Sequence, residues 1–227
     1  MTICISSPEP GDPPSDCPLC PRLASFRLEN RVNFPSYFNN PVPSFGPISA
    51  RLLIVGLAPG LKGANRTGRP FTGDYAGILL YETLLKFGFA HGSYDAHPGD
   101  ELTLNDCRIT NAARCVPPEN KPLPSEIATC NAFLRTTLQE MNNLTAIVAL
   151  GRIAHAAVVR AQAARAAQHP FAHGRASDLK PGVKLFGCYH CSRYNTNTGR
   201  LTTDMFHAVF REAAAHIDGA VTQSAPC

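Results

Sequence analysis

Short apolar runs alternate along the chain with longer stretches whose apolar residues recur at helical spacing. Four runs are typical of buried β-strands: Arg51–Leu57, Cys107–Thr110, Ala146–Leu150 and Lys184–Tyr189. Helices are predicted over Pro21–Glu29, Ala76–Phe89, Ser125–Asn142, an Ala-rich stretch from Gly151 to Gln168, and Thr203–His216. Strands that alternate with helices predict an α/β fold whose parallel sheet is covered on both faces.

Polar segments follow the predicted strands at residues 56–77, 111–122 and 189–202. In open parallel sheets, ligands bind in the crevice beyond the carboxyl ends of the strands. We therefore expect the functional residues of this chain to lie in these three segments.

The composition narrows the class of protein. A chain of 227 residues suits one domain over residues 1–227, with an irregular segment at residues 1–50 and a flexible tail at residues 218–227. Hydrophobic residues at 44% and charged residues at 17% argue against disorder and against a coiled coil. No apolar run approaches the ~20 residues of a membrane span, and the N-terminus has no basic or apolar leader. We expect a cytoplasmic protein, and its net charge of +4 permits a polyanionic partner.

Nine cysteines without an export signal favour metal or redox chemistry over structural disulfides. Two CxxC pairs are present, Cys17 with Cys20 and Cys188 with Cys191. Cys188 closes an apolar strand, so burial as a small hydrophobic side chain is the favoured interpretation for that pair. For the first pair, a site is expected in which Cys17 and Cys20 join Cys115 and Cys130. Such a site would hold the irregular N-terminal segment to the main body. Four thiolates suit either zinc or an iron–sulfur cluster.

The segment GLAPGLKGANRTGRPFTGDYAG, residues 56–77, is rich in glycine and carries one carboxylate, Asp74. Its backbone N–H groups favour an anion such as phosphate. The segment matches neither the nucleotide P-loop nor the dinucleotide-binding pattern. Phe71 stands among polar residues, where it serves either as a stacking partner for a flat ligand or as an anchor in the core. Residues 190–200, HCSRYNTNTGR, suit a solvated loop or contacts with a nucleic-acid backbone.

Taken together, these segments resemble the uracil-DNA glycosylase superfamily, and in particular its iron–sulfur branch called family 5. GLAPG with NRTGRPFTGD resembles the first motif of that branch, HCSRYNTNTGR its second, and ITNAARCVPPENKP its middle segment. The resemblance implies a three-layer α/β/α sandwich with a four-stranded parallel sheet. It also implies that Cys17, Cys20, Cys115 and Cys130 hold a structural [4Fe–4S] cluster, and it gives no ligand role to Cys188 or Cys191.

The same resemblance implies an enzyme that flips and excises uracil, and other deaminated bases such as hypoxanthine, from double-stranded DNA. His190 resembles the donor to the O2 atom of the leaving base. Asn111 resembles the residue that binds the Watson–Crick edge, and Phe71 the stacking platform. The backbone at Gly56, Ala58 and Gly60 is expected to contact the base.

Leu57 and Ala58 stand where other branches of the superfamily carry a polar residue, so Asp74 is the candidate that stabilises the sugar cation or positions water. Asp74 also precedes a predicted helix, where an N-cap role is the alternative. An apolar wall at positions 57 and 58 predicts tolerance of larger bases. Contacts with DNA are expected from the polar residues of both loops: Arg66, Arg69, Ser192, Asn195, Asn197, Thr198 and Arg200.

A monomer is expected. Two other functions remain open: a module of this fold that binds lesions or abasic sites with little excision, and a cluster-bearing redox or RNA-binding protein.

Overall fold

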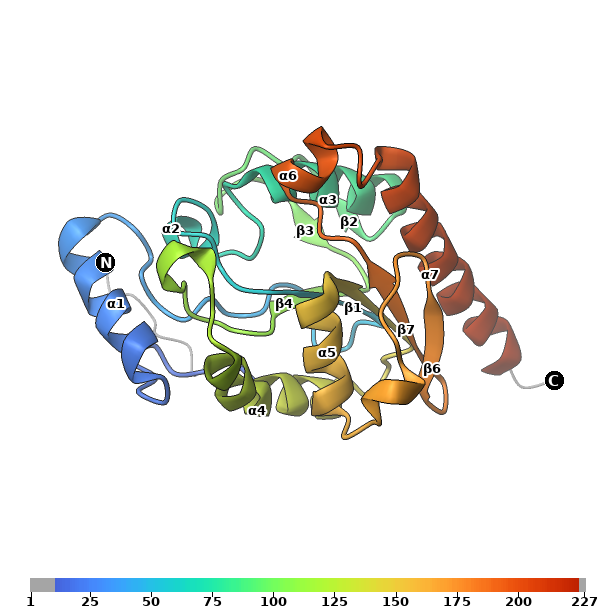
Figure 1. The fold of residues 1–227 in the computed structure, drawn as a ribbon. Helices are drawn as coiled ribbons and strands as arrows, with labels where there is room; N and C mark the ends of the chain where they lie inside the picture. The colour runs from blue at the N-terminus through green and yellow to red at the C-terminus, as the bar shows by residue number, and fades with distance from the viewer. Residues whose placement is uncertain (1–10, 225–227) are drawn as a thin grey trace.

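The computed structural model describes residues 11–224, with side chains to residue 220, and shows a central sheet between two layers of helices (Figure 1). The sheet has the order β4-β1-β5-β7-β6. Its strands are β1 (Leu52–Gly56), β4 (Cys107–Asn111), β5 (Ala146–Leu150), β6 (Ala176–Lys180) and β7 (Val183–Cys188). The four predicted strands are the four that run parallel. Every residue of β1, β4 and β5 is buried, which explains their continuous apolar patterns.

The fifth strand corrects the prediction of a purely parallel, four-stranded sheet. β6 pairs antiparallel with β7 at the edge of the sheet, and exposed residues alternate along it with the partly buried Ser177 and the buried Leu179. An edge strand with the sequence ASDLK lacks the apolar run that identifies an interior strand.

Two hydrophobic clusters fill the spaces on either side of the sheet. One face of β1, with Leu52 and Ile54, packs against α3 (Tyr75–Lys86) and α7 (Thr203–Ser224). The other face, with Leu53 and Val55, packs against α4 (Pro124–Glu140) and α5 (Arg152–Ala161). The chain is therefore the α/β/α sandwich that the alternation of strands and helices predicts.

Helices α3 and α4 lie within three residues of their predicted bounds, and the other three predicted helices differ by more. The Ala-rich helix α5 ends at Ala161, because Ala163 has a φ of 53°, and the chain continues into η2 (Ala166–Gln168). Helix α7 continues to Ser224, through most of the expected flexible tail, and residues 225–227 lie outside the described part of the chain. Helix α1 (Pro21–Asn33) begins at the predicted residue and is longer than predicted.

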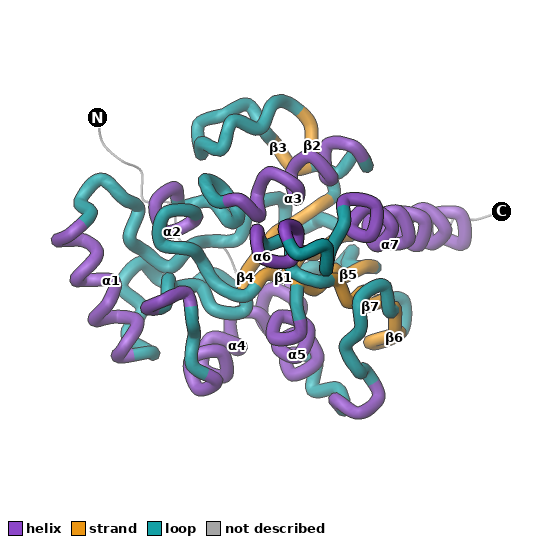
Figure 2. Tube along the Cα trace, turned by 45° about the horizontal axis from the view of Figure 1, so that its top comes forward, coloured by secondary structure: helices purple, strands orange, loops and turns teal. Residues whose placement is uncertain are grey.

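The remaining elements are short and flank the main sheet. The strands β2 (Ala90–His91) and β3 (Thr103–Leu104) form an antiparallel pair beside α3 (Figures 1 and 2). The helices α2 (Ala64–Thr67), η1 (Pro118–Asn120) and α6 (Arg193–Asn197) lie in the three segments that follow β1, β4 and β7. No described helix is long and apolar enough to cross a membrane.

The N-terminal segment lies beyond β4, at the edge of the sheet opposite β6 (Figures 1 and 2). Residues 1–10 lie outside the described part of the chain. Asp12 fixes the rest of the segment by an ion pair with Arg114, with 2.7 Å between Oδ1 and Nη1. Both side chains are nearly inaccessible to solvent, at 7% and 1% exposure. Asp12 also accepts hydrogen bonds from the backbone and hydroxyl of Ser44.

Asp12→Ala is expected to lower the free energy of unfolding by about 3–5 kcal/mol, because it leaves the buried Arg114 guanidinium without its counter-charge. Urea denaturation followed by circular dichroism measures the change. Asp16→Ala is the matched control, since Asp16 pairs with Arg31 at an exposed position, and it should leave the midpoint unchanged. Equal effects of the two substitutions would contradict a structural role for the Asp12–Arg114 pair.

Candidate active site

A cleft of about 330 Å³ opens at the carboxyl ends of β1, β4 and β7. Asn111 reaches it from the end of β4, and His190 from the segment that follows β7. Leu57, Ala58 and Gly60 line it from the segment that follows β1. The cleft therefore brings together residues of all three segments that the sequence marks as candidates.

Gly56 lies directly beneath this cleft, at the end of β1. A Cβ atom at position 56 would lie 2.3 Å from Asn111 Oδ1 and 2.6 Å from Phe71 Cζ. Such contacts are far shorter than van der Waals distances, so only glycine lets the Asn111 amide and the Phe71 ring meet here. Gly56 acts by its missing side chain, whereas Ala58 and Gly60 line the cleft themselves.

Phe71 is buried and forms one wall of the cleft. Its backbone has a φ of 56°, in the left-handed region that non-glycine residues seldom adopt. The ring centroid lies 6.0 Å from that of His190, with 30° between the planes. The anchoring alternative also holds in part, because the ring belongs to the hydrophobic cluster that contains Leu80 and Ile54.

Asp74 lies both at the start of α3 and in the lining of the cleft. It is the N-cap of α3, where Oδ1 accepts a hydrogen bond of 3.2 Å from the Gly77 backbone. It also lines the cleft, packed so closely on Gly63 that a Cβ there would lie 2.6 Å from Oδ2. Burial raises the pKa of Asp74, and the backbone N–H groups of Gly77 and Ala76 partly oppose that shift.

His190 carries an imidazole that is neutral at physiological pH. Burial lowers its pKa to about 4, because the charged ring would lose its hydration. Its backbone carbonyl accepts a hydrogen bond of 2.8 Å from Asn195 Nδ2, which ties the cleft to helix α6. A neutral imidazole in this cleft can donate one hydrogen bond without carrying a charge.

The other residues of the second loop lie around the cleft mouth or beyond it. Ser192 lines the cleft and caps α6. Asn195 and Arg200 line an adjoining pocket, which His190 also borders. Arg66, Asn197, Thr198 and Arg200 are exposed, and Arg200 stacks on Tyr189 with 4.8 Å between its Cζ atom and the ring centroid.

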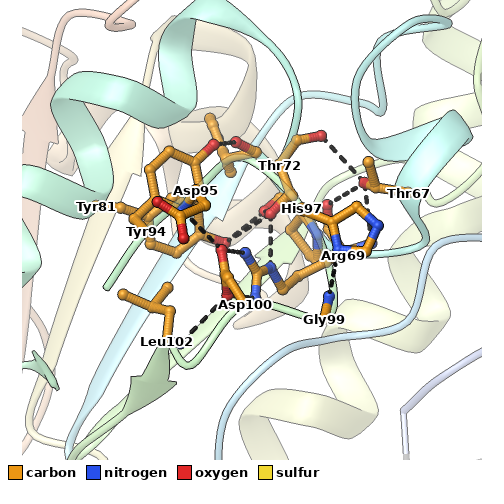
Figure 3. A network of polar contacts seen from close by, with 12 residues as sticks. Thr67, Arg69, Thr72, Tyr81, Tyr94, Asp95, His97, Gly99, Asp100 and Leu102 are labelled. Carbon is orange, nitrogen blue, oxygen red and sulfur yellow. Dashed lines mark hydrogen bonds and ion pairs between the residues drawn. The ribbon is translucent and has the colours of Figure 1, made fainter. Parts of the chain in front are cut away.

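Arg69, which the sequence analysis expects to contact DNA, is buried in the structure. Its side chain is 7% exposed and makes a two-pronged ion pair with Asp100, with both N–O distances 2.7 Å (Figure 3). The guanidinium also lies against the rings of Phe45, Tyr81 and Tyr94. A buried and fully paired arginine supports the loop from inside the protein.

Three cleft residues with polar side chains were not predicted from the sequence: Tyr75, Asn120 and Arg193. Asn120 has a φ of 57° in the Pro-rich loop after β4, and its Oδ1 atom lies 4.0 Å from the Cβ position of Gly60. The sequence carried one signal for it, an asparagine that ends VPPEN, since asparagine is the residue after glycine that most readily adopts a positive φ.

Cys17, Cys20, Cys115 and Cys130 line one narrow cavity. Two buried guanidinium groups lie beside it: Arg27 Nη1 is 3.6 Å from Cys115 Sγ, and Arg114 also lines the cavity. Among the described side chains, no group of three or more His, Cys, Asp or Glu is arranged to hold a single metal ion. The second CxxC pair, Cys188 and Cys191, lies in the hydrophobic core.

Comparison with known proteins matches residues 43–214 to the uracil DNA glycosylase superfamily. The chain therefore belongs to that superfamily. Within it, the chain is 44% identical to the type-5 uracil-DNA glycosylase of Thermus thermophilus, over 87% of this chain and 92% of the relative. It is 39% identical to the type-5 uracil-DNA glycosylase of Pyrobaculum aerophilum, over 88% of each chain. A type-4 uracil-DNA glycosylase of Thermotoga maritima is 35% identical over 58% of this chain and 62% of the relative.

The His190 imidazole is expected to titrate near pH 4 in the folded protein. NMR spectra of the imidazole nitrogens across a pH series measure this midpoint, and His190→Gln identifies the signal. Because the unfolded chain binds this proton near pH 6.5, the free energy of unfolding should fall as the pH drops from 6.5 towards 4. A signal that titrates near pH 6.5 would contradict a buried, neutral ring.

Proposed function

We propose that this chain is a monofunctional DNA glycosylase that acts as a single-domain monomer. It flips uracil, and other deaminated bases such as hypoxanthine, out of double-stranded DNA and hydrolyses the N-glycosidic bond to leave an abasic site. The observation that carries this proposal is the convergence of Phe71, Asn111, Asp74 and His190 on one cleft. The similarity to type-5 uracil-DNA glycosylases along most of the chain supports it.

The roles of these residues follow from the charge that develops during the reaction. As the glycosidic bond breaks, the sugar becomes positive and the departing base becomes negative. The neutral His190 ring donates a hydrogen bond to the base oxygen, where a preorganised donor stabilises the new negative charge. The Asp74 carboxylate stabilises the sugar cation and orients water. Phe71 stacks on the flipped base, and the Asn111 amide binds its polar edge.

The breadth of base specificity is inferred from the side of the cleft that the segment after β1 forms. Leu57 and Ala58 line the cleft and offer no side-chain hydrogen bond. Strong rejection of a wrong base requires a polar group that the wrong base leaves unpaired. An apolar wall therefore tolerates hypoxanthine beside uracil. For binding of the duplex we propose the exposed or cleft-mouth polar residues Arg66, Ser192, Asn195, Asn197, Thr198 and Arg200, and we exclude the buried Arg69.

Base release from a duplex that carries one uracil, with a hypoxanthine duplex in parallel, tests the function. We expect release of both bases in the presence of a metal chelator. Asp74→Asn should slow single-turnover release about 100- to 1,000-fold, a range typical for loss of one electrostatic group in an active site. Its amide oxygen still caps α3, so the thermal midpoint should stay close to that of the unsubstituted chain.

Two outcomes would contradict the assignment. Full activity of Asp74→Asn would reduce Asp74 to a helix cap. Tight duplex binding without release of either base would instead favour a module that binds DNA lesions or abasic sites.

We further infer that Cys17, Cys20, Cys115 and Cys130 hold a [4Fe–4S] cluster. The donor set is entirely sulfur, as such clusters require. The buried Arg27 and Arg114 supply positive charge beside four thiolates, and Arg27 Nε has no hydrogen-bond partner among the described residues. When bound, the cluster cross-links the N-terminal segment to the loop after β4 and to α4, which makes its contribution structural.

Cys115→Ala is expected to remove the visible absorbance of the purified protein and most of its iron and acid-labile sulfide. Cys188→Ala is the control, because Cys188 is a thiol of the second CxxC pair and lies in the hydrophobic core, away from the cavity that Cys115 lines. Absorbance spectra and iron and sulfide analysis of both variants make the comparison. Loss of absorbance in Cys188→Ala, or its retention in Cys115→Ala, would overturn the ligand assignment.

A further inference from the structure

The loop that carries Phe71 is held by a buried polar network behind the cleft (Figure 3). Arg69 and Asp100 form its centre, in the two-pronged ion pair that encloses both charges. Arg69 Nε donates a further hydrogen bond of 2.7 Å to Thr72 Oγ1. Arg69 and Thr72 stand on either side of Pro70 and Phe71 in the sequence. Their hydrogen bond therefore joins the two ends of the short loop that carries Phe71.

The network continues through Asp100 to a second segment, residues 92–102, which joins β2 to β3. Asp100 Oδ2 accepts a hydrogen bond of 3.0 Å from the backbone of Asp95, and Oδ1 accepts one of 3.2 Å from Leu102. These bonds fix the backbone next to Tyr94. The Tyr94 ring packs on Tyr81, with 4.5 Å between centroids, and both rings lie against the Arg69 guanidinium.

Both tyrosine hydroxyls donate hydrogen bonds to backbone carbonyls of the loop that carries Phe71. Tyr81 donates to the Pro70 carbonyl at 2.6 Å, and Tyr94 donates to the Phe71 carbonyl at 3.2 Å. The Phe71 carbonyl also lies where a side chain of residue 77 would begin, since a Cβ there would be 1.7 Å away. Contacts on several sides therefore hold the left-handed backbone of Phe71, which would otherwise be unfavourable.

We propose that Arg69, Asp100 and Tyr94 are positioning residues that hold the Phe71 ring in the orientation needed to stack on a flipped base. This inference rests on the proposed base-flipping function. It assigns a role to the β2–β3 segment, none of whose residues lines the cleft itself. A ring that is already oriented lets the flipped base bind without a further loss of freedom in the loop.

Tyr94→Phe tests the proposal, because it removes the hydroxyl that bonds to Phe71 and keeps the ring that packs on Tyr81. Amide hydrogen exchange of peptides that span residues 69–77 should become at least fivefold faster, as expected for loss of one hydrogen bond. Tyr37→Phe is the matched control, since Tyr37 stacks on Phe34 outside the network, and it should leave exchange in residues 69–77 unchanged. Unchanged exchange in Tyr94→Phe overturns the proposal whether or not the chain is a glycosylase.

A double-mutant cycle separates positioning of the ring from a general loss of stability. In a chain that keeps Phe71, Tyr94→Phe should slow single-turnover release of uracil about fivefold and leave the affinity for the duplex unchanged. In a Phe71→Ala background, where no ring is left to orient, the same substitution should have no further effect. Equal slowing in both backgrounds would overturn the proposal. Absence of uracil release by the unsubstituted chain would instead refute the proposed function, and the exchange measurement would then decide the positioning role alone.

Discussion

At the end of β1, the Asn111 amide and the Phe71 ring occupy the space that a side chain at position 56 would need. The register of the sheet creates this contact, because Gly56 pairs directly with Asn111 across β1 and β4. The loop after β1 then has room to fold back over its own strand and bring Phe71 into the wall of the cleft. A side chain at this position would force the Asn111 amide and the Phe71 ring apart.

The cleft favours neutral groups over charged ones. Burial lowers the pKa of His190 to about 4 and raises the pKa of Asp74, so in each case burial disfavours the charged form of the side chain. The two cases differ in what opposes the shift. Asp74 accepts backbone hydrogen bonds at the start of α3 that favour its carboxylate, whereas burial alone acts on His190. One neutral donor and one carboxylate that accepts backbone hydrogen bonds therefore lie in the same cleft, where partial burial strengthens electrostatic interactions.

Interior strands were predictable from sequence because burial on both faces leaves a continuous apolar run, as in β5. The edge strand β6 leaves no such run and was missed. The motifs located the chain segments that form the cleft. They did not distinguish the exposed arginines of these segments, Arg66 and Arg200, from the buried Arg69. Arg69 has its partner 31 residues away, in a segment with no recognisable pattern, so only the tertiary fold reveals the pair. Asn120 was missed for a related reason, since a loop conformation brings it to Gly60.

The attachment of the N-terminal segment has a consequence for the order in which the chain acquires its structure. Asp12 and Arg114 are separated by 102 residues, and Arg27 meets Cys115 across 88. Residues 12–33 are synthesised before β4 and α4, yet the surface that receives them is complete only after those two elements have been made. Helix α1 therefore cannot dock until β4 and α4 have been made. Its docking closes a long loop, the stretch of chain between the N-terminal segment and the residues after β4. A segment that is synthesised early therefore docks only after residues 88 to 102 positions further along the chain have been made.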